Sequence, residues 1–129
     1  MLGSTKKLSK NPIEIKMQTK PTLIDCQPPY YVVTFANKKT ATQQGYSETL
    51  MQILALAQKQ KGFLGLDSCS NAENFGITNS YWESLADIKN WKQQSDHLIA
   101  QNKGKERWYE CYTVNIAKVE HSYAFNSGE

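Results

Sequence analysis

The sequence predicts one α+β domain in which four strands and two helices follow the order β-α-β-β-α-β. Three observations support this class. A run of aromatic and β-branched residues, YYVVTFA, opens the patterned part of the chain. Two segments with apolar residues at helical spacing follow, with a pair of short apolar runs between them. An alternating segment closes the order, which is that of the ferredoxin-like fold with an antiparallel sheet.

Charge and length exclude some classes of function. The 129 residues suffice for one domain with its own core. The net charge of +3 comes from residues 1–28, which hold five lysines against two acidic residues, so the remainder is neutral with ten of each. A neutral domain does not favour a nucleic-acid surface. The first and third strands also lack the basic-aromatic pattern of RNA-binding sheets, so we expect no nucleic-acid partner.

The cysteines and the hydropathy indicate a reducing compartment. Cys26, Cys69 and Cys111 are odd in number and widely spaced, which argues against a disulfide framework or a zinc site. No apolar run approaches the roughly 18 residues of a membrane span, and no apolar segment of a secretory signal follows the first lysines. We therefore expect a cytoplasmic protein with no metal and no membrane partner.

The first third of the chain contains an extension, a strand and a helix. Residues 1–29 are polar, lysine-containing and end in two prolines, so we interpret them as a flexible extension before a domain at 30–125 and a tail at 126–129. Residues 30–36 predict a central strand and 37–39 a loop. Thr40 with Gln43 resembles a capping box for a helix that ends before Gly62. Its apolar positions are Tyr46, Leu50, Ile53, Leu54 and Ala57.

The rest of the chain predicts a hairpin, a helical region and a final strand. Residues 63–69 and 75–83 form the hairpin around a turn at 71–74. Ser84 and Asp87 form a capping-box pattern, so a helix should start at Leu85, with Leu85, Ile88 and Trp91 on one face. Ser95 can cap a second helical turn within the region that ends at 101. Gly104 interrupts the pattern before a last strand at 110–125.

The strands carry apolar residues on both faces, whereas two helices can cover only one face of such a sheet. We therefore expect a homodimer that forms through the uncovered sheet face. The residues concerned are Val32 and Val33, Phe63 and Leu64, Tyr81 and Trp82, and Val114 and Ile116.

The segment SYWESLADIKNWKQQSDHLIAQ resembles the antibiotic biosynthesis monooxygenase family of dimeric α+β barrels. In that family a Trp near the end of the third strand is followed by a helix ending in Trp, and by a His one short turn later. Here these are Trp82, Trp91 and His97. The resemblance covers residues 30–125 and is greatest to a subgroup described only by its domain, through the pieces PPYYVVTF, KGFLGLDS, FGITNSYWES and RWYECY.

The resemblance implies one of two chemistries. Some members oxygenate reduced polycyclic aromatics or quinols with O2 and without a cofactor. Others bind and degrade heme with an Asn, a Trp and an iron-ligating His. The Trp corresponds to Trp91 and the Asn falls near Asn37 or Lys38. The position of the heme-ligating His falls near Gln101, one helical turn after His97, which is a departure from the heme pattern.

Cofactor-free oxygenation needs a substrate that can be deprotonated, a base and a dry aromatic site. His97 has the ordinary pKa for such a base, and we predict that it forms the catalytic pair with Trp91. Flat side chains could bind a planar substrate, and amides or hydroxyls could orient its oxygen. The predicted substrate-binding residues are Tyr31, Tyr81 and Trp82 for the walls, and Asn37, Gln94 and Tyr109 for the polar contacts.

Ordinary structural roles remain open for these side chains. A lone His near a helical turn is often a surface residue, and a Trp on an apolar helix face is often core. Phosphate loops, HExxH and GxSxG motifs do not occur in the sequence. Our leading hypothesis is a cofactor-independent monooxygenase for a small aromatic or quinol-like molecule. Heme binding with degradation is the alternative, and a non-catalytic ligand-binding dimer module on the same fold is a third.

Overall fold

A computed structural model describes residues 26–101 and 104–128, so most of the predicted N-terminal extension lies outside the described residues. The predicted β-α-β-β-α-β order and the ferredoxin-like α+β class are confirmed, with one short extra helix before the last strand. Within the described residues the elements are β1 (Tyr30–Lys39), α2 (Tyr46–Lys59), β2 (Phe63–Ser70), β3 (Phe75–Trp82), α3 (Leu85–Gln101), α4 (Gly104–Trp108) and β4 (Tyr109–Val119).

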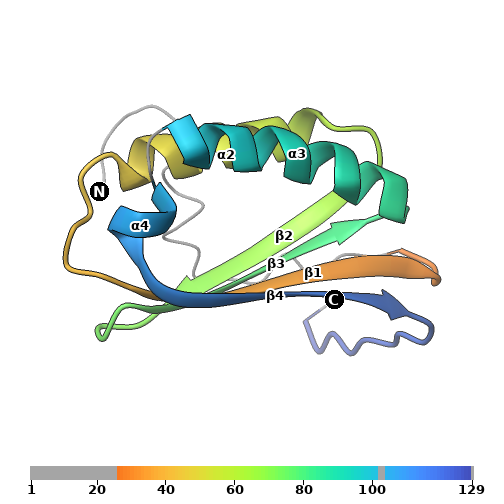
Figure 1. The fold of residues 1–129 in the computed structure, drawn as a ribbon. Coiled ribbons are helices and arrows are strands. Elements are labelled where there is room, and N and C mark those ends of the chain that lie inside the picture. Colours follow the sequence, from red (N-terminus) through yellow and green to blue (C-terminus); the bar gives the residue numbers. More distant parts are fainter. Residues whose placement is uncertain (1–25, 102–103, 129) are drawn as a thin grey trace.

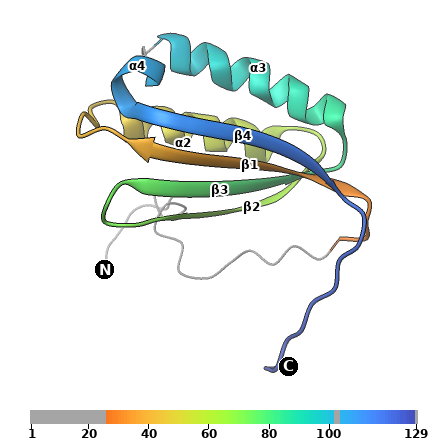
Figure 2. The same cartoon turned by 60° about the horizontal axis from the view of Figure 1, so that its bottom comes forward.

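The four strands form one antiparallel sheet in the order β2-β3-β1-β4, so β4 is an edge strand (Figures 1 and 2). Val33 in β1 lies opposite Ser80 in β3 and Ile116 in β4. Residues directly opposite share a face of a sheet. Val33 packs in a core cluster with Ala57 of α2 and Ile88 of α3, so its face is the one that the helices cover. We call this the helix face and the opposite one the outer face.

The core lies between the helices and the two central strands of the sheet, β1 and β3. It consists of Val33, Ala57, Trp82 and Ile88, with further aromatic rings packed against it. Trp82 has no exposed surface, and its ring lies 5.2 Å from that of Trp91. Helix α2 lies on the β2 side of the sheet and α3 on the β4 side (Figures 1 and 2), yet side chains of β4 on the helix face stay partly exposed. Burial of these rings accounts for a large part of the hydrophobic stabilisation.

The predicted start of α3 is confirmed by its capping contacts. The backbone N–H of Asp87 donates to Ser84 Oγ (3.1 Å), and the Ser84 hydroxyl donates to Asp87 Oδ2 (2.8 Å). The predicted cap at Ser95 is wrong, because α3 is continuous and the Ser95 hydroxyl donates to the Trp91 carbonyl of the preceding turn (3.0 Å). Leu85 is 54% exposed and does not share the buried face, because it begins the helix beyond the core.

The predicted capping box at Thr40 is also wrong. Helix α2 begins at Tyr46, after Gly45 in the left-handed conformation (φ 81°). The Thr40 backbone N–H instead donates to the carbonyl of Trp108 (2.8 Å), and the Gln43 side-chain amide donates to the Thr40 carbonyl (2.6 Å). These residues therefore form a loop that is tied to α4.

Two strand boundaries differ from the prediction. Residues 37–39 belong to β1 and not to a loop, because β3 and the start of β4 supply backbone partners for them. The last strand ends at Val119, because Val119 pairs with Tyr30, the first residue of β1, and no β1 residue remains to pair beyond it. Residues 120–128, with His121, continue outside the sheet. In the described part of the chain, no helix has the length and apolarity of a membrane span.

Gly62 supports the capping box and generates a stability prediction. It has φ 85°, its carbonyl accepts from the Glu83 N–H (2.8 Å), and an added Cβ would collide with the Asp87 carboxylate. Gly62→Ala should therefore lower the free energy of unfolding by about 1–2 kcal/mol for the backbone conformation, and by more if Asp87 is displaced. Urea unfolding followed by circular dichroism measures the loss. Gly128→Ala, near the end of the exposed tail, is the control and should change stability by less than about 0.5 kcal/mol.

Candidate functional site

The helix face of β4 is an open apolar surface. Tyr112, Val114 and Ile116 alternate along it and share a face with Val33 of the core, yet they are 38%, 37% and 46% exposed. β4 is an edge strand, and α3 lies on its side of the sheet without covering these side chains (Figures 1 and 2). We call these three residues the floor. An exposed apolar row beside a covered core is a candidate ligand surface.

One end of the floor is closed by an aromatic group. Tyr112 packs against Phe35 of β1 (ring centroids 5.3 Å apart) and against Tyr109 (5.5 Å). Tyr46, the first residue of α2, packs against Tyr109 (6.0 Å) and Trp108 (5.5 Å). Most of these pairs are edge-to-face, the arrangement that aromatic quadrupoles favour. We call Phe35, Tyr46, Trp108, Tyr109 and Tyr112 the aromatic end.

Trp108 positions the aromatic end. It is 1% exposed, and its indole N–H donates to the Gln44 carbonyl (2.9 Å). Its own carbonyl accepts the Thr40 N–H (2.8 Å). The loop before α2 and the helix α4 are thus held together from both sides, and Tyr46 and Tyr109, which flank them in sequence, come into contact.

The two tyrosines at this end form a half-buried hydroxyl pair. Burial raises the pKa of Tyr109, and the neighbouring Tyr46, to which the Tyr109 hydroxyl donates, raises it further. Burial also raises the pKa of Tyr46, although the hydrogen bond that it accepts from Tyr109 opposes that shift. Both phenols are therefore neutral at ordinary pH. Because Tyr46 accepts from Tyr109, its own O–H is the proton that the pair can offer to a ligand.

Asn37 and Lys39 add polar groups on the helix face beside the aromatic end. Asn37 is 6% exposed and lies opposite Tyr112 in β4. Its Oδ1 accepts a hydrogen bond from Lys39 Nζ (3.1 Å). Lys39 Nζ also lies 5.8 Å from the centroid of the Tyr46 ring, and partial burial lowers the pKa of Lys39. The arrangement offers a cation, an amide and a phenol to a ligand on the floor.

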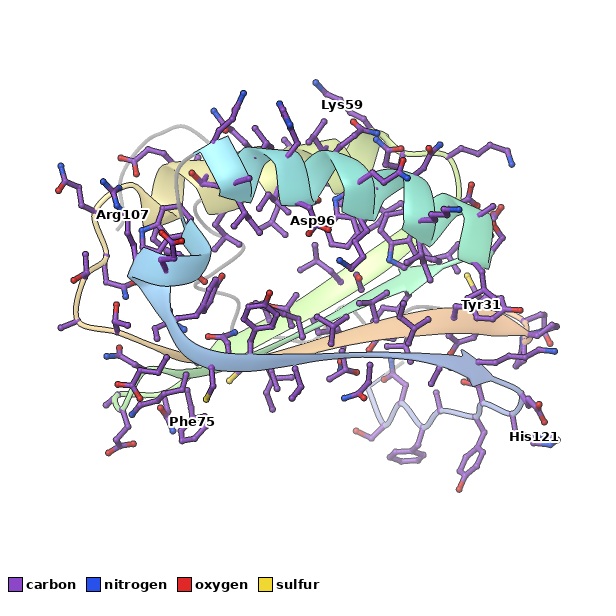
Figure 3. The ribbon with its side chains drawn as sticks, viewed as in Figure 1. Tyr31, Lys59, Phe75, Asp96, Arg107 and His121 are labelled. Carbon is purple, nitrogen blue, oxygen red and sulfur yellow. The ribbon has the colours of Figure 1, made fainter. Side chains whose placement is uncertain are left out.

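Only part of the predicted site comes together. Asn37 and Tyr109 lie at the aromatic end. Trp82 and Trp91 pack in the core, where the Trp91 indole N–H donates to the Ile53 carbonyl (3.2 Å). Tyr31 also packs against that core, six residues from Asn37 along β1, or about 20 Å. Figure 3 shows Tyr31 and Arg107 of α4 at opposite ends of the molecule.

The remaining predicted residues lie elsewhere. His97 is exposed, and its Nε2 lies 3.2 Å from Nε2 of Gln101, which is also exposed. Six positions separate His97 from Trp91, so their side chains project from different sides of α3. Gln94 is exposed, and its amide donates to the Asn90 carbonyl (3.4 Å). Tyr81 lies on the outer face, where its hydroxyl donates to Asp67 (3.3 Å).

These positions also test the heme alternative. An iron-ligating His must face a cavity whose walls enclose the porphyrin. His97 and Gln101 instead share an exposed side of α3. The residues around His97 therefore do not fit a heme ligand, and the catalytic pairing of His97 with Trp91 stays a sequence prediction.

Sequence reasoning did not identify Lys39, Tyr46, Phe35 and Tyr112 as site residues. Lys39 fell in a predicted loop, and the other three were assigned only to apolar faces of their elements. A signal was present for Tyr46, because a tyrosine that begins an amphipathic helix carries a hydroxyl at the edge of the core. The signal for Lys39 is its spacing of two from Asn37, which matters only once the strand is known to extend that far.

Comparisons with known proteins agree with this fold. No protein-family model matches the chain. Over 99 residues it is 42% identical to the uncharacterized protein YqjZ of Bacillus subtilis (strain 168), covering 77% of this chain and 87% of that protein. A Nitrosomonas europaea protein of unknown function, NE2512, has a TM-score of 0.55 at 14% identity, covering 78% of this chain and 97% of that one.

Two further similar structures are of an oxygenase and of a candidate monooxygenase. SnoaB, a cofactor-independent oxygenase from Streptomyces nogalater, has a TM-score of 0.52 at 7% identity and covers 79% of this chain and all of its own. A candidate antibiotic biosynthesis monooxygenase from Nitrosomonas europaea has a TM-score of 0.53 at 14% identity. The match covers 75% of this chain and 95% of that one. At these identities the likeness shows a shared fold.

The tyrosine pair predicts a specific loss of stability in alkali. In the unfolded chain Tyr109 ionises near its ordinary pKa of 10, whereas in the folded protein its pKa is higher. Its contribution to stability is therefore complete below pH 10 and is lost as the pH rises above that value. Tyr109→Phe should make the decline in unfolding free energy above pH 10 shallower, by up to about 1.4 kcal/mol per pH unit. Tyr123→Phe, at a side chain that is 99% exposed, is the control. Equal slopes for Tyr109→Phe and wild type would contradict the half-buried pair.

Proposed function

Because this chain belongs to the protein family of Bacillus subtilis YqjZ and has the antibiotic biosynthesis monooxygenase-like α+β fold, we propose that it is a cofactor-independent oxygenase for a small aromatic or quinol-like substrate. The observation that carries the proposal is the floor. It is a row of exposed apolar side chains on the covered side of a sheet, and it ends in polar donors. A planar ring would lie on Tyr112, Val114 and Ile116.

The chemistry requires no external reductant. A ring methylene or hydroquinone-type carbon loses a proton and becomes an electron-rich anion, which O2 can oxidise. In the oxidation of a methylene to a carbonyl, the substrate supplies all four electrons that O2 takes up. One oxygen atom enters the new carbonyl and the other leaves as water. The protein must therefore favour the anionic form of the substrate and hold it out of bulk water.

The aromatic end supplies groups for that task. The Tyr46 O–H and the Asn37 amide are donors beside the floor, and donors aimed at an oxygen that gains negative charge lower the pKa of the bound substrate. A side-chain base is not needed if this stabilisation brings the pKa of the substrate near the ambient pH, because water then accepts the proton. The exposed position of His97 supports this route over proton abstraction by imidazole.

Oxygen uptake with a dihydroxynaphthalene tests the activity. We expect consumption above the autoxidation rate of the substrate, and Tyr46→Phe should lower it by about 10- to 100-fold because one donor is removed. His97→Ala separates the two mechanisms. Turnover should be lost if His97 is the base, as the sequence predicted, and kept if the donors beside the floor stabilise the anion and water accepts the proton. Uptake no faster than autoxidation would contradict an oxygenase. Saturable binding without uptake would support the non-catalytic ligand-binding alternative.

A homodimer is the partner that the outer face supports. Phe75 and Ile77 of β3 are 56% and 51% exposed there, and no helix covers them (Figure 3 labels Phe75 on that side). Tyr123 and Phe125 in the segment after β4 are 99% and 87% exposed, so they add apolar surface that a second copy could bury. Burying such a surface against its own copy is the usual solution for soluble oligomers.

Substitution on the two faces tests the dimer by light scattering after size-exclusion chromatography. Ile77→Glu should shift the protein from dimer to monomer, because it places a charge in the proposed interface. Leu85→Glu is a matched control, since Leu85 is 54% exposed but begins α3 on the opposite side of the sheet. A wild-type monomer, or equal behaviour of the two variants, would contradict dimerisation through the outer face.

A further inference from the structure

A small polar niche lies over Gly76, on the helix face between β1 and β3. Gly76 of β3 is directly opposite Asn37 of β1. A Cβ at Gly76 would lie 2.9 Å from Lys39 Nζ, 3.3 Å from Asn37 Nδ2 and 3.4 Å from Asn37 Oδ1. The missing side chain is therefore what allows the lysine and asparagine heads to gather at this point of the sheet.

The niche holds more hydrogen-bond donors than acceptors. The Lys39 ammonium can only donate, so Asn37 must turn its amide oxygen toward it and its NH2 group elsewhere. One donor of the ammonium is used by this contact. Within residues 26–101 and 104–128, the ion pairs do not include Lys39, and Asn37 Nδ2 has no acceptor among these residues. Lys39 Nζ and Asn37 Nδ2 nevertheless both lie within 3.3 Å of the position that a Cβ at Gly76 would take, so one positive charge and two sets of N–H donors border the same space.

The niche adjoins the floor. Gly76, Asn37 and Tyr112 form one row across three neighbouring strands, in which Asn37 is directly opposite each of the other two. Adjacent strands are about 5 Å apart. A ring that lies on Tyr112 therefore has the niche within reach of a substituent that carries one or two oxygen atoms.

We propose that the niche formed by Asn37, Lys39 and Gly76 binds the carboxylate of an aromatic acid whose ring lies on the floor. The inference rests on the proposed function and specifies its substrate class. A carboxylate accepts from both donor sets at once, and it neutralises the half-buried ammonium that has no acidic partner in the described residues. A neutral arene would leave these donors without that charge-assisted contact.

The test compares binding of 2-naphthoate with binding of 2-naphthalenemethanol, a neutral molecule of similar shape, by calorimetry. Wild type should bind the acid more tightly. Lys39→Met should weaken acid binding by about 10- to 100-fold and leave alcohol binding nearly unchanged, because a charge-assisted hydrogen bond is lost. The acid preference of wild type should also decrease with added salt.

The chain offers a matched control in the neighbouring residue. Lys38 lies on the outer face, where its Nζ donates to the Glu73 carbonyl (2.7 Å) and lies 5.4 Å from the Phe75 ring centroid. Lys38→Met makes the same change of charge one residue away and should leave both affinities unchanged. Gly76→Ala keeps the charges of Lys38 and Lys39 but fills the niche with a methyl group. It should therefore also reduce binding of the acid and leave binding of the alcohol unchanged. Circular dichroism of each variant checks its fold.

The outcomes separate the two proposals. Equal affinities of wild type for acid and alcohol, or equal effects of Lys39→Met and Lys38→Met, would overturn the carboxylate niche, and oxygen uptake with neutral quinols would still support the oxygenase. If neither probe binds and no oxygen is consumed, both proposals fail. Selective loss of the acid in Lys39→Met and Gly76→Ala, without oxygen uptake, would support the niche and contradict the oxygenase.

Discussion

The contacts of Trp108 hold the candidate site together. Its indole N–H and its carbonyl bond to the loop before α2, and its ring is almost fully buried. The Thr40 hydroxyl adds a further hydrogen bond between this loop and α4, to the Arg107 carbonyl, and neither segment is long enough to form its own core. Tyr46 and Tyr109 follow directly from the two tied segments, so their contact depends on Trp108. The aromatic end is therefore a tertiary feature built from residues 64 positions apart.

The uneven cover of the sheet separates stability from function. Around Trp82 of β3 the two long helices pack closely on the sheet, with Trp91 against Trp82, and this region supplies the core. On β4, the floor residues of the same face stay partly exposed, so some apolar surface is left unburied. A protein that covered this surface as well would gain hydrophobic stabilisation and lose the floor. Trp82 and Trp91, the two tryptophans that the sequence analysis singled out, accordingly belong to the structural part.

The sequence predicted the fold far better than the site. Hydrophobic periodicity located every strand and both long helices, and the Ser84–Asp87 pattern located the start of α3, because these signals are local. The extent of β1 depended on partners in β3 and β4 that no local pattern reveals, and this error placed Lys39 in a loop. His97 drew attention by residue type, whereas its side of α3 depends on how the helix packs. Asn37 and Tyr109 were identified, but their proximity to Tyr46 required the Trp108 contacts.

The electrostatics of the aromatic end connect the two proposals. Burial keeps both Tyr46 and Tyr109 neutral, so the phenols add donors and no negative charge. Lys39 then sets the charge of the site, because it forms no ion pair within the described residues. Partial burial lowers its pKa, which means that the surroundings stabilise the cation poorly, and an anionic ligand relieves that deficit. Cofactor-free oxygenation needs an anion on an apolar surface, and a site with one unpaired cation at the end of an apolar floor favours the formation of that anion.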